Sequence, residues 1–104
     1  MKLAEQSAPR CIEFLHDLVT VPSPSRGERL ACERVMREME LLSFREVHID
    51  EMGNVLGRVG SGPRVLAYDA HIDTVGISYP THWRYDPFRG IVTGGSLFGR
   101  GASD

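Results

Sequence analysis

The sequence has no long apolar run, and no segment approaches the roughly 18 residues that a membrane-spanning helix needs. Its first ten residues, MKLAEQSAPR, have no apolar core behind the lysine, so we expect no secretory signal there. A long run of like charges is also missing, since 12 basic and 14 acidic residues give a formal net charge of −2. These absences predict a protein that binds neither nucleic acid nor membrane.

Cysteine is scarce. Cys11 and Cys32 are the only two, and both fall in segments expected to be helical, with apolar neighbours. Two thiols could form one disulfide, but these surroundings favour two small buried hydrophobic residues in a reducing compartment. We therefore expect a cytoplasmic protein.

The first part of the chain predicts a helix. Pro9 stands where a first-turn proline would, and the apolar residues after it have helical spacing. The helix should end before Val21-Pro22-Ser23-Pro24-Ser25, because a residue that precedes proline avoids helical backbone angles. Its apolar positions are Cys11, Ile12, Leu15, Leu18 and Val19.

A second helix is expected to follow. Ser25 stands three residues before Glu28, a spacing that predicts a capping box at the start of this helix. The inward stripe should consist of Ala31, Val35, Met39 and Leu42. The charged residues are expected mostly in water, as a solvated face and not a binding patch: Glu33, Arg34, Arg37, Glu38 and Glu40.

After Ser43 the spacing of apolar residues becomes that of strands. Residues 44–49 and 55–59 are expected to form strands joined by a turn at residues 50–54. The short apolar run Val65-Leu66-Ala67-Tyr68 predicts a strand buried on both faces. Two helices followed by such strands predict an α/β sandwich around a mixed sheet.

Residues 75–95 show no clear period and contain glycine, proline and several aromatic residues. An irregular segment of this length in so small a chain is often functional. A surface loop anchored by its aromatic side chains is an equally good interpretation. The aromatic residues are Tyr79, Trp83, Tyr85 and Phe88.

His71 and Asp73 follow the expected buried strand directly. Ligands gather at the carboxyl ends of strands in open α/β sheets. In extended chain the two side chains share a face, and a carboxylate beside a neutral imidazole can orient a zinc ligand. A histidine that simply bonds a neighbouring loop is commoner than a metal site, so the pair alone leaves both interpretations open.

The stretch from Gly94 to Asp104 is expected to form a glycine-rich loop. The glycines of Gly99-Arg100-Gly101 allow positive φ or close approach, which would help to place the Asp104 carboxylate. A phosphate-binding loop is excluded, because Arg100 and Gly101 stand where that motif requires Lys and Ser or Thr.

Taken together, these motifs resemble one family, the dinuclear zinc hydrolases that include aminoacylase, acetylornithine deacetylase, succinyl-diaminopimelate desuccinylase and related carboxypeptidases. The Val21–Ser25 segment and the Gly53-Asn54-Val55 turn match the early part of the family's pattern. The resemblance covers nearly the whole chain, in the family's order. Its strongest parts are His71-Ile72-Asp73-Thr74-Val75, Trp83 with Asp86-Pro87-Phe88, and Leu97-Phe98-Gly99-Arg100-Gly101-Ala102-Ser103-Asp104.

The resemblance implies roles for three residues. His71 matches a histidine ligand of one zinc, and Asp104 matches the aspartate that bridges two zinc ions, which cobalt can replace. Asp73 matches the catalytic-site carboxylate that supports the histidine and the metal environment. Ala70 and Gly76 depart from the commonest residues, glycine and proline, and this blurs the subfamily.

The family's general base belongs to a Glu-Glu pair, and no such dipeptide occurs in this sequence. We expect no replacement ligands from His16, His48 or His82, for which surface or loop roles fit better. Residues 1–104 are therefore expected to be the N-terminal portion of the catalytic domain. The fold should be an incomplete α/β/α sandwich, without the rest of that domain and without the smaller lid domain, through which the family can form homodimers.

The resulting expectation is part of a zinc-dependent hydrolase that cleaves N-acyl-amino acids or small peptides by a metal-activated water. By itself the 104-residue chain is expected to be inactive. Two alternatives remain open: a non-catalytic binding or remnant protein, and one half of a zinc site completed by a second chain.

Overall fold

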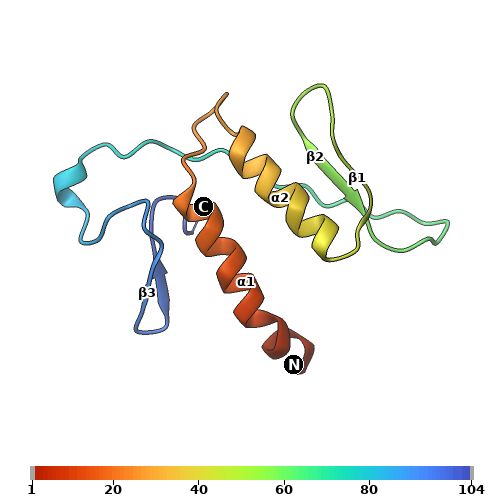
Figure 1. The fold of residues 1–104 in the computed structure, drawn as a ribbon, viewed down its shortest axis with the longest axis horizontal. Coiled ribbons are helices and arrows are strands. Elements are labelled where there is room, and N and C mark those ends of the chain that lie inside the picture. The colour runs from red at the N-terminus through yellow and green to blue at the C-terminus, as the bar shows by residue number, and fades with distance from the viewer. Residues whose placement is uncertain (1, 104) are drawn as a thin grey trace.

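The computed structural model describes residues 2–103, which form two α-helices, a short 3₁₀ helix and two β-hairpins (Figure 1). The α/β class is confirmed, with an incomplete fold. Both sheets are two-stranded and antiparallel, pairing β1 with β2 and β3 with β4. The elements are α1 (Lys2–Thr20), α2 (Arg29–Leu41), β1 (Arg45–Ile49), β2 (Val55–Arg58), η1 (Pro80–His82), β3 (Ile91–Thr93) and β4 (Ser96–Phe98).

Helix α1 begins earlier than its proline indicated. Pro9 lies inside the helix and not in its first turn, so that prediction was wrong. The preceding residues include Lys2, Leu3, Ala4 and Glu5, which are good helix formers and extend the helix toward the N-terminus. The helix ends at Thr20, before the Val21-Pro22 boundary, as expected.

The predicted capping box at the start of α2 is wrong. Glu28 is the N-cap residue, and no side chain caps the helix. Glu28 Oε1 instead accepts a hydrogen bond from the backbone N–H of Arg26 at 2.7 Å. Ser25 Oγ donates to Asp73 Oδ2 at 2.6 Å, so a contact between distant segments replaces the local cap.

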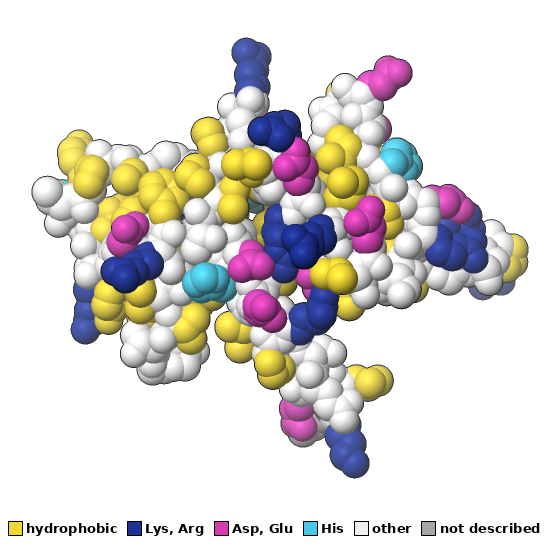
Figure 2. Space-filling view, viewed as in Figure 1, with side chains coloured by type: hydrophobic (Ala, Val, Ile, Leu, Met, Phe, Trp, Pro, Cys, Tyr) yellow, Lys and Arg dark blue, Asp and Glu magenta, His cyan; other side chains and the backbone are white. Residues whose placement is uncertain are grey.

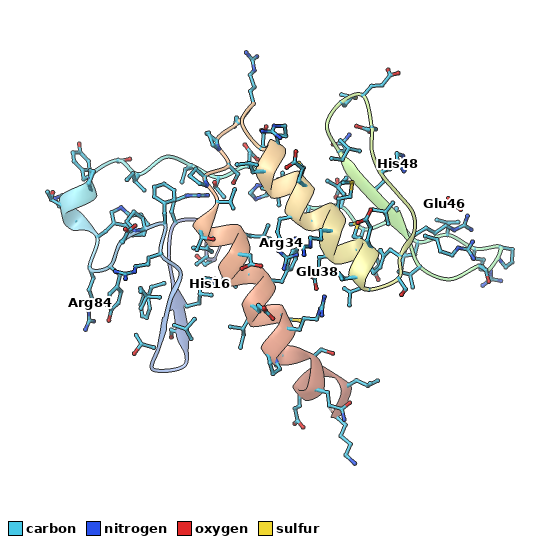
Figure 3. The ribbon with its side chains drawn as sticks, viewed as in Figure 1. His16, Arg34, Glu38, Glu46, His48 and Arg84 are labelled. Atoms are coloured by element: carbon cyan, nitrogen blue, oxygen red, sulfur yellow. The ribbon has the colours of Figure 1, made fainter. Side chains whose placement is uncertain are left out.

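The two helices are joined by charges. Charged side chains gather between them (Figure 2), and Figure 3 shows Arg34 and Glu38 there. Glu38 accepts hydrogen bonds from Arg10 Nε at 2.6 Å and Arg34 Nη1 at 2.8 Å. Arg34 Nε also donates to Asp17 at 2.8 Å, and its guanidinium lies over the Phe14 ring. Placing Arg34 and Glu38 mostly in water was therefore wrong, since Glu38 is buried.

The apolar stripe of α2 is only partly enclosed. Ala31 is buried while Val35 and Met39 are half-buried, as the stripe predicts, but Leu42 is exposed. Cys32 is buried as predicted, whereas the prediction for Cys11 was wrong because it is exposed. Among residues 2–103 the buried hydrophobic side chains are Val19, Ala31 and Cys32, which is a very small core.

The first hairpin follows the predicted pattern, with strands slightly shorter than expected. Asp50 closes its turn, since the Asp50 N–H donates to Asn54 O at 3.0 Å and Asp50 Oδ1 accepts from the Asn54 N–H at 2.8 Å. The hairpin lies against α2. A β-carbon at Gly57 would stand 2.8 Å from Met39 Sδ, so a larger residue there would displace the Met39 side chain.

The predicted buried strand at Val65–Tyr68 is wrong. Residues 64–77 form no strand, and Val65, Leu66 and Tyr68 are 76%, 75% and 88% exposed. A strand buried on both faces needs neighbouring strands and covering helices, and residues 2–103 do not supply them here. The radius of gyration is 15.4 Å, against about 13 Å for a compact chain of this length. The chain is thus extended, with much of its apolar surface in solvent.

Residues 75–95 are largely irregular, as predicted, but the glycine-rich stretch after them is not simply a loop. Gly94 and Gly95 have φ of +57° and +76°, which suits a two-residue hairpin turn. This turn pairs Thr93 with Ser96 and Ile91 with Phe98. Within the described residues, neither α-helix is sufficiently long and apolar to span a membrane.

We predict that Glu38→Gln lowers the free energy of unfolding of the complete protein by about 1–3 kcal/mol at pH 7. The hydrogen bond from Arg10, and then that from Arg34, lower the pKa of Glu38 below its usual 4.5. This stabilisation is therefore present above about pH 4.5 and is lost as the pH falls through the lower, folded-state pKa.

Urea denaturation between pH 3 and pH 7 measures the effect. The matched control is Glu33→Gln, which breaks the exposed Arg29–Glu33 pair on the same helix and should cost less than about 0.5 kcal/mol. Equal losses in the two variants would contradict a special role for Glu38.

Candidate functional site

The His71–Asp73 pair lies in the irregular segment between β2 and η1 (Figure 1). His71 Nδ1 lies 2.9 Å from the backbone oxygen of Asp73 and 3.3 Å from its Oδ1. Both oxygens can only accept, so Nδ1 must carry the proton. In the neutral ring this places the lone pair on Nε2, the form in which an imidazole binds a metal.

The Asp73 carboxylate is held at both oxygens. Its Oδ2 accepts the Ser25 hydroxyl at 2.6 Å, while Oδ1 faces His71. The hydrogen bond from Ser25, and then that from His71, lower the pKa of Asp73. The carboxylate is therefore stabilised in its charged form.

A second set of hydrogen bonds ties the same two segments together. The Thr74 N–H donates to the Ser23 carbonyl at 2.8 Å, and the two hydroxyls lie 2.9 Å apart. Ser23 is buried beside the end of α1. These contacts join residues 51 positions apart in sequence. Sequence analysis interpreted the Val21–Ser25 segment as a helix end, with a capping serine, and as a family match, and nothing local in it indicated these partners.

Arg100 connects a third segment to the first two. Its guanidinium donates to the Val21 carbonyl at 3.0 Å and to the Thr74 hydroxyl, and it lies over the Phe88 ring at 5.0 Å. The side chain is 2% exposed, and burial lowers its pKa. No carboxylate within the described part of the chain pairs with it. Sequence analysis treated Arg100 as a loop residue and missed this buried cation.

The glycines beside Arg100 behave as expected. Gly101 has φ of +73°. A β-carbon at Gly99 would overlap the Val19 side chain and stand 3.1 Å from the Pro87 oxygen. The predictions of positive φ and close approach are thus confirmed for the two glycines that flank the buried Arg100.

These groups surround a cavity of about 140 Å³ beside the end of α1. One wall is apolar, formed by Leu15, Leu18 and Val19. His71, Asp73 and Arg100 line it as well. The cavity therefore combines a metal-binding type of side chain with a carboxylate and a cation.

The other histidines serve other contacts. His48 is exposed on β1, with Nδ1 2.7 Å from Glu46 O, and His82 stacks on Tyr79. His16 is half-buried on α1, and Gly90 packs against its ring. Surface or loop roles are confirmed for His48 and His82. Over residues 2–103 no three His, Cys, Asp or Glu side chains form a metal-binding group. Asp104, the expected bridging ligand, lies outside the described residues.

The chain is similar in sequence to longer bacterial proteins. It is 50% identical over 91 residues to the Escherichia coli K12 protein named "Uncharacterized protein YgeY", matching 88% of this chain and 23% of that protein. It is 41% identical over 63 residues to the succinyl-diaminopimelate desuccinylase of Beijerinckia indica, covering 61% of this chain and 16% of the relative. With the desuccinylase of Methylocella silvestris, identity is 32% over 106 residues, covering 98% and 27%.

This homology to succinyl-diaminopimelate desuccinylases supports the family that the motifs resemble. The chain spans between 16% and 27% of the length of these relatives. No protein-family model matches the chain, and no solved structure does.

We predict that Arg100→Met destabilises the complete protein by about 1–3 kcal/mol, because the half-buried Val21 carbonyl and the Thr74 hydroxyl lose their donor. Arg100→Lys should recover little of this loss, since one ammonium cannot reproduce the planar fork of donors. Urea denaturation measures both variants. Arg64→Met, at an exposed arginine, is the control, and Arg100→Met should differ clearly from it.

Proposed function

We propose that residues 1–104 are the N-terminal part of the catalytic domain of a zinc-dependent hydrolase. Its substrates would be N-acyl-amino acids or small peptides, cleaved at an amide bond. The observation that carries this proposal is the contact of His71 with Asp73 in a partly apolar cavity. The homology to proteins named desuccinylases supports it.

The donor set fits part of a zinc site. A metal-binding histidine usually donates its other ring N–H to a carboxylate or a carbonyl, and His71 Nδ1 meets both. His71 would be a zinc ligand, and Asp104 would bridge the two ions, with cobalt able to replace zinc. Bound zinc would polarise the amide carbonyl and lower the pKa of a water molecule.

The described side chains would bind and orient. His71 would hold its proton on Nδ1, and Asp73 would keep that proton in place. Ser25 would hold the carboxylate, while Arg100 would fix the backbone that carries the pair. The apolar side chains of Leu15, Leu18 and Val19 would form one wall of the site.

The described residues supply only part of the proposed site. Further ligands, a glutamate base and a smaller lid and dimerisation domain would come from elsewhere in the complete protein, which would be cytoplasmic and could form a homodimer. The share of each relative that the chain spans supports this arrangement. So do the exposed apolar side chains at Val65, Leu66 and Tyr68, which need a cover.

We predict that the complete protein, loaded with zinc, hydrolyses N-acyl-amino acids and that His71→Ala lowers kcat/KM by more than about 100-fold. The variant should also bind less zinc, measured by atomic emission after dialysis. His82→Ala, in the stacked pair with Tyr79, is the control and should keep both activity and zinc. Full activity in His71→Ala would contradict the assigned role.

We also predict that the purified 104-residue chain does not hydrolyse these amides, even with added zinc. Its described residues do not assemble three metal-binding side chains, and three protein ligands are usual in a catalytic zinc site. Zinc-dependent hydrolysis that disappears on His71→Ala would refute this. Activity only after adding a second chain would instead indicate a two-chain site.

A further inference from the structure

His71 Nδ1 has two acceptors, and both belong to Asp73. Residues of the segment between α1 and α2 fix the position of each acceptor. The first is the Asp73 carbonyl, whose peptide unit also contains the Thr74 N–H. That N–H donates to the Ser23 carbonyl at 2.8 Å, which fixes the plane of the peptide. The second is Asp73 Oδ1, and the carboxylate to which it belongs is held through Oδ2 by Ser25.

The two acceptors differ in strength, and the weaker one, Asp73 Oδ1, depends on Ser25 for its position. The contact with the carbonyl is 2.9 Å long, whereas the contact with Oδ1 is 3.3 Å, slightly longer than the usual range. The Asp73 side chain is 43% exposed, so water competes for it and other rotamers are open to it. The 2.6 Å bond from Ser25 is short and charge-assisted, and it selects the rotamer that points Oδ1 at the ring.

The backbone around Ser25 is suited to this task. Pro22 and Pro24 restrict φ on either side of Ser23, which reduces the entropy lost when the segment is ordered. The Gly27 N–H donates to the Pro24 carbonyl at 2.7 Å, closing a turn with Ser25 and Arg26 at its centre. Arg26 has φ of +70°, an uncommon value for a residue with a side chain. The turn therefore presents the Ser25 hydroxyl in a defined direction.

We propose that Ser25 is a positioning residue of the site, which sets the tautomer and orientation of His71 by holding the Asp73 carboxylate. It acts through Asp73 and needs no metal to do so. Its consequence for zinc binding rests on the proposed function, whereas its effect on the imidazole does not.

The test follows the His71 ring in the complete, metal-free protein. The protein is labelled with ¹⁵N-histidine and studied at about pH 9, where imidazoles are neutral. Two-bond ¹H–¹⁵N correlation spectra distinguish the two tautomers, and His71→Gln assigns the signal. The wild-type ring should carry its proton on Nδ1. Ser25→Ala should shift part of the population to the Nε2–H form, and Ser25→Thr, which retains a hydroxyl, should restore the wild-type signal.

Two controls separate positioning from general stability. Ser61→Ala, at an exposed serine in the loop after β2, should leave the His71 signal unchanged. In an Asp73→Ala background, Ser25→Ala should have no further effect, because the carboxylate that transmits it is gone. An unchanged tautomer in Ser25→Ala, or an equal shift in both backgrounds, would overturn the proposal.

Zinc affinity then tests the link with the proposed function. If His71 binds zinc, Ser25→Ala should weaken binding by about 10–100-fold in competition with a chelator. A tautomer shift without any change in zinc affinity would support the role of Ser25 and contradict zinc binding by His71.

Discussion

The buried guanidinium of Arg100 is the contact on which the site depends. It reaches the Val21 carbonyl and the Thr74 hydroxyl at once, and so joins three segments that lie far apart in sequence. The two glycines beside Arg100 give the backbone an unusual conformation at this point. Gly99 lets the backbone approach Val19 closely, and Gly101 takes up a positive φ. The guanidinium is desolvated without a carboxylate partner among the described residues, so its hydrogen bonds to neutral oxygens offset the cost of burial.

The contacts of Arg100 with Val21 and Thr74 form a junction that helps to position the polar site, although the hydrophobic core is very small. The buried hydrophobic residues of the described part, Val19, Ala31 and Cys32, give little apolar driving force. Hydrogen bonds between Ser23 and Thr74, and between Ser25 and Asp73, fix the segment that carries His71. Ion pairs join α1 to α2, the two helices on either side of the Val21–Ser25 segment. The site is therefore positioned by polar contacts, and the exposed apolar surface around it is suited to further packing.

The sequence predicted elements well where local chemistry decides them. The Asp50–Asn54 turn, the strands beside it and the end of α1 before Pro22 all follow from short-range preferences. It failed where a residue had a choice of partners. Ser25 had the spacing of a helix cap but bonds to Asp73, and Glu38 had the position of a solvated charge but lies between two arginines. Val65–Tyr68 had the pattern of a buried strand, but burial depends on neighbours that a pattern does not contain.

For the site, the sequence by itself determined that His71 and Asp73 can share a face, and that glycines beside Arg100 permit unusual backbone. These follow from the two-residue period of extended chain and from the absence of a β-carbon. Only the tertiary structure decided that Nδ1 of His71 carries the proton, that Ser25 holds the carboxylate, and that Arg100 is buried between Val21 and Thr74. The physical reason is that a hydrogen bond depends on distance and direction in space. The partners of Ser25 and Arg100 lie 26 to 79 residues away along the chain, and even the neighbouring His71 and Asp73 can meet in several orientations.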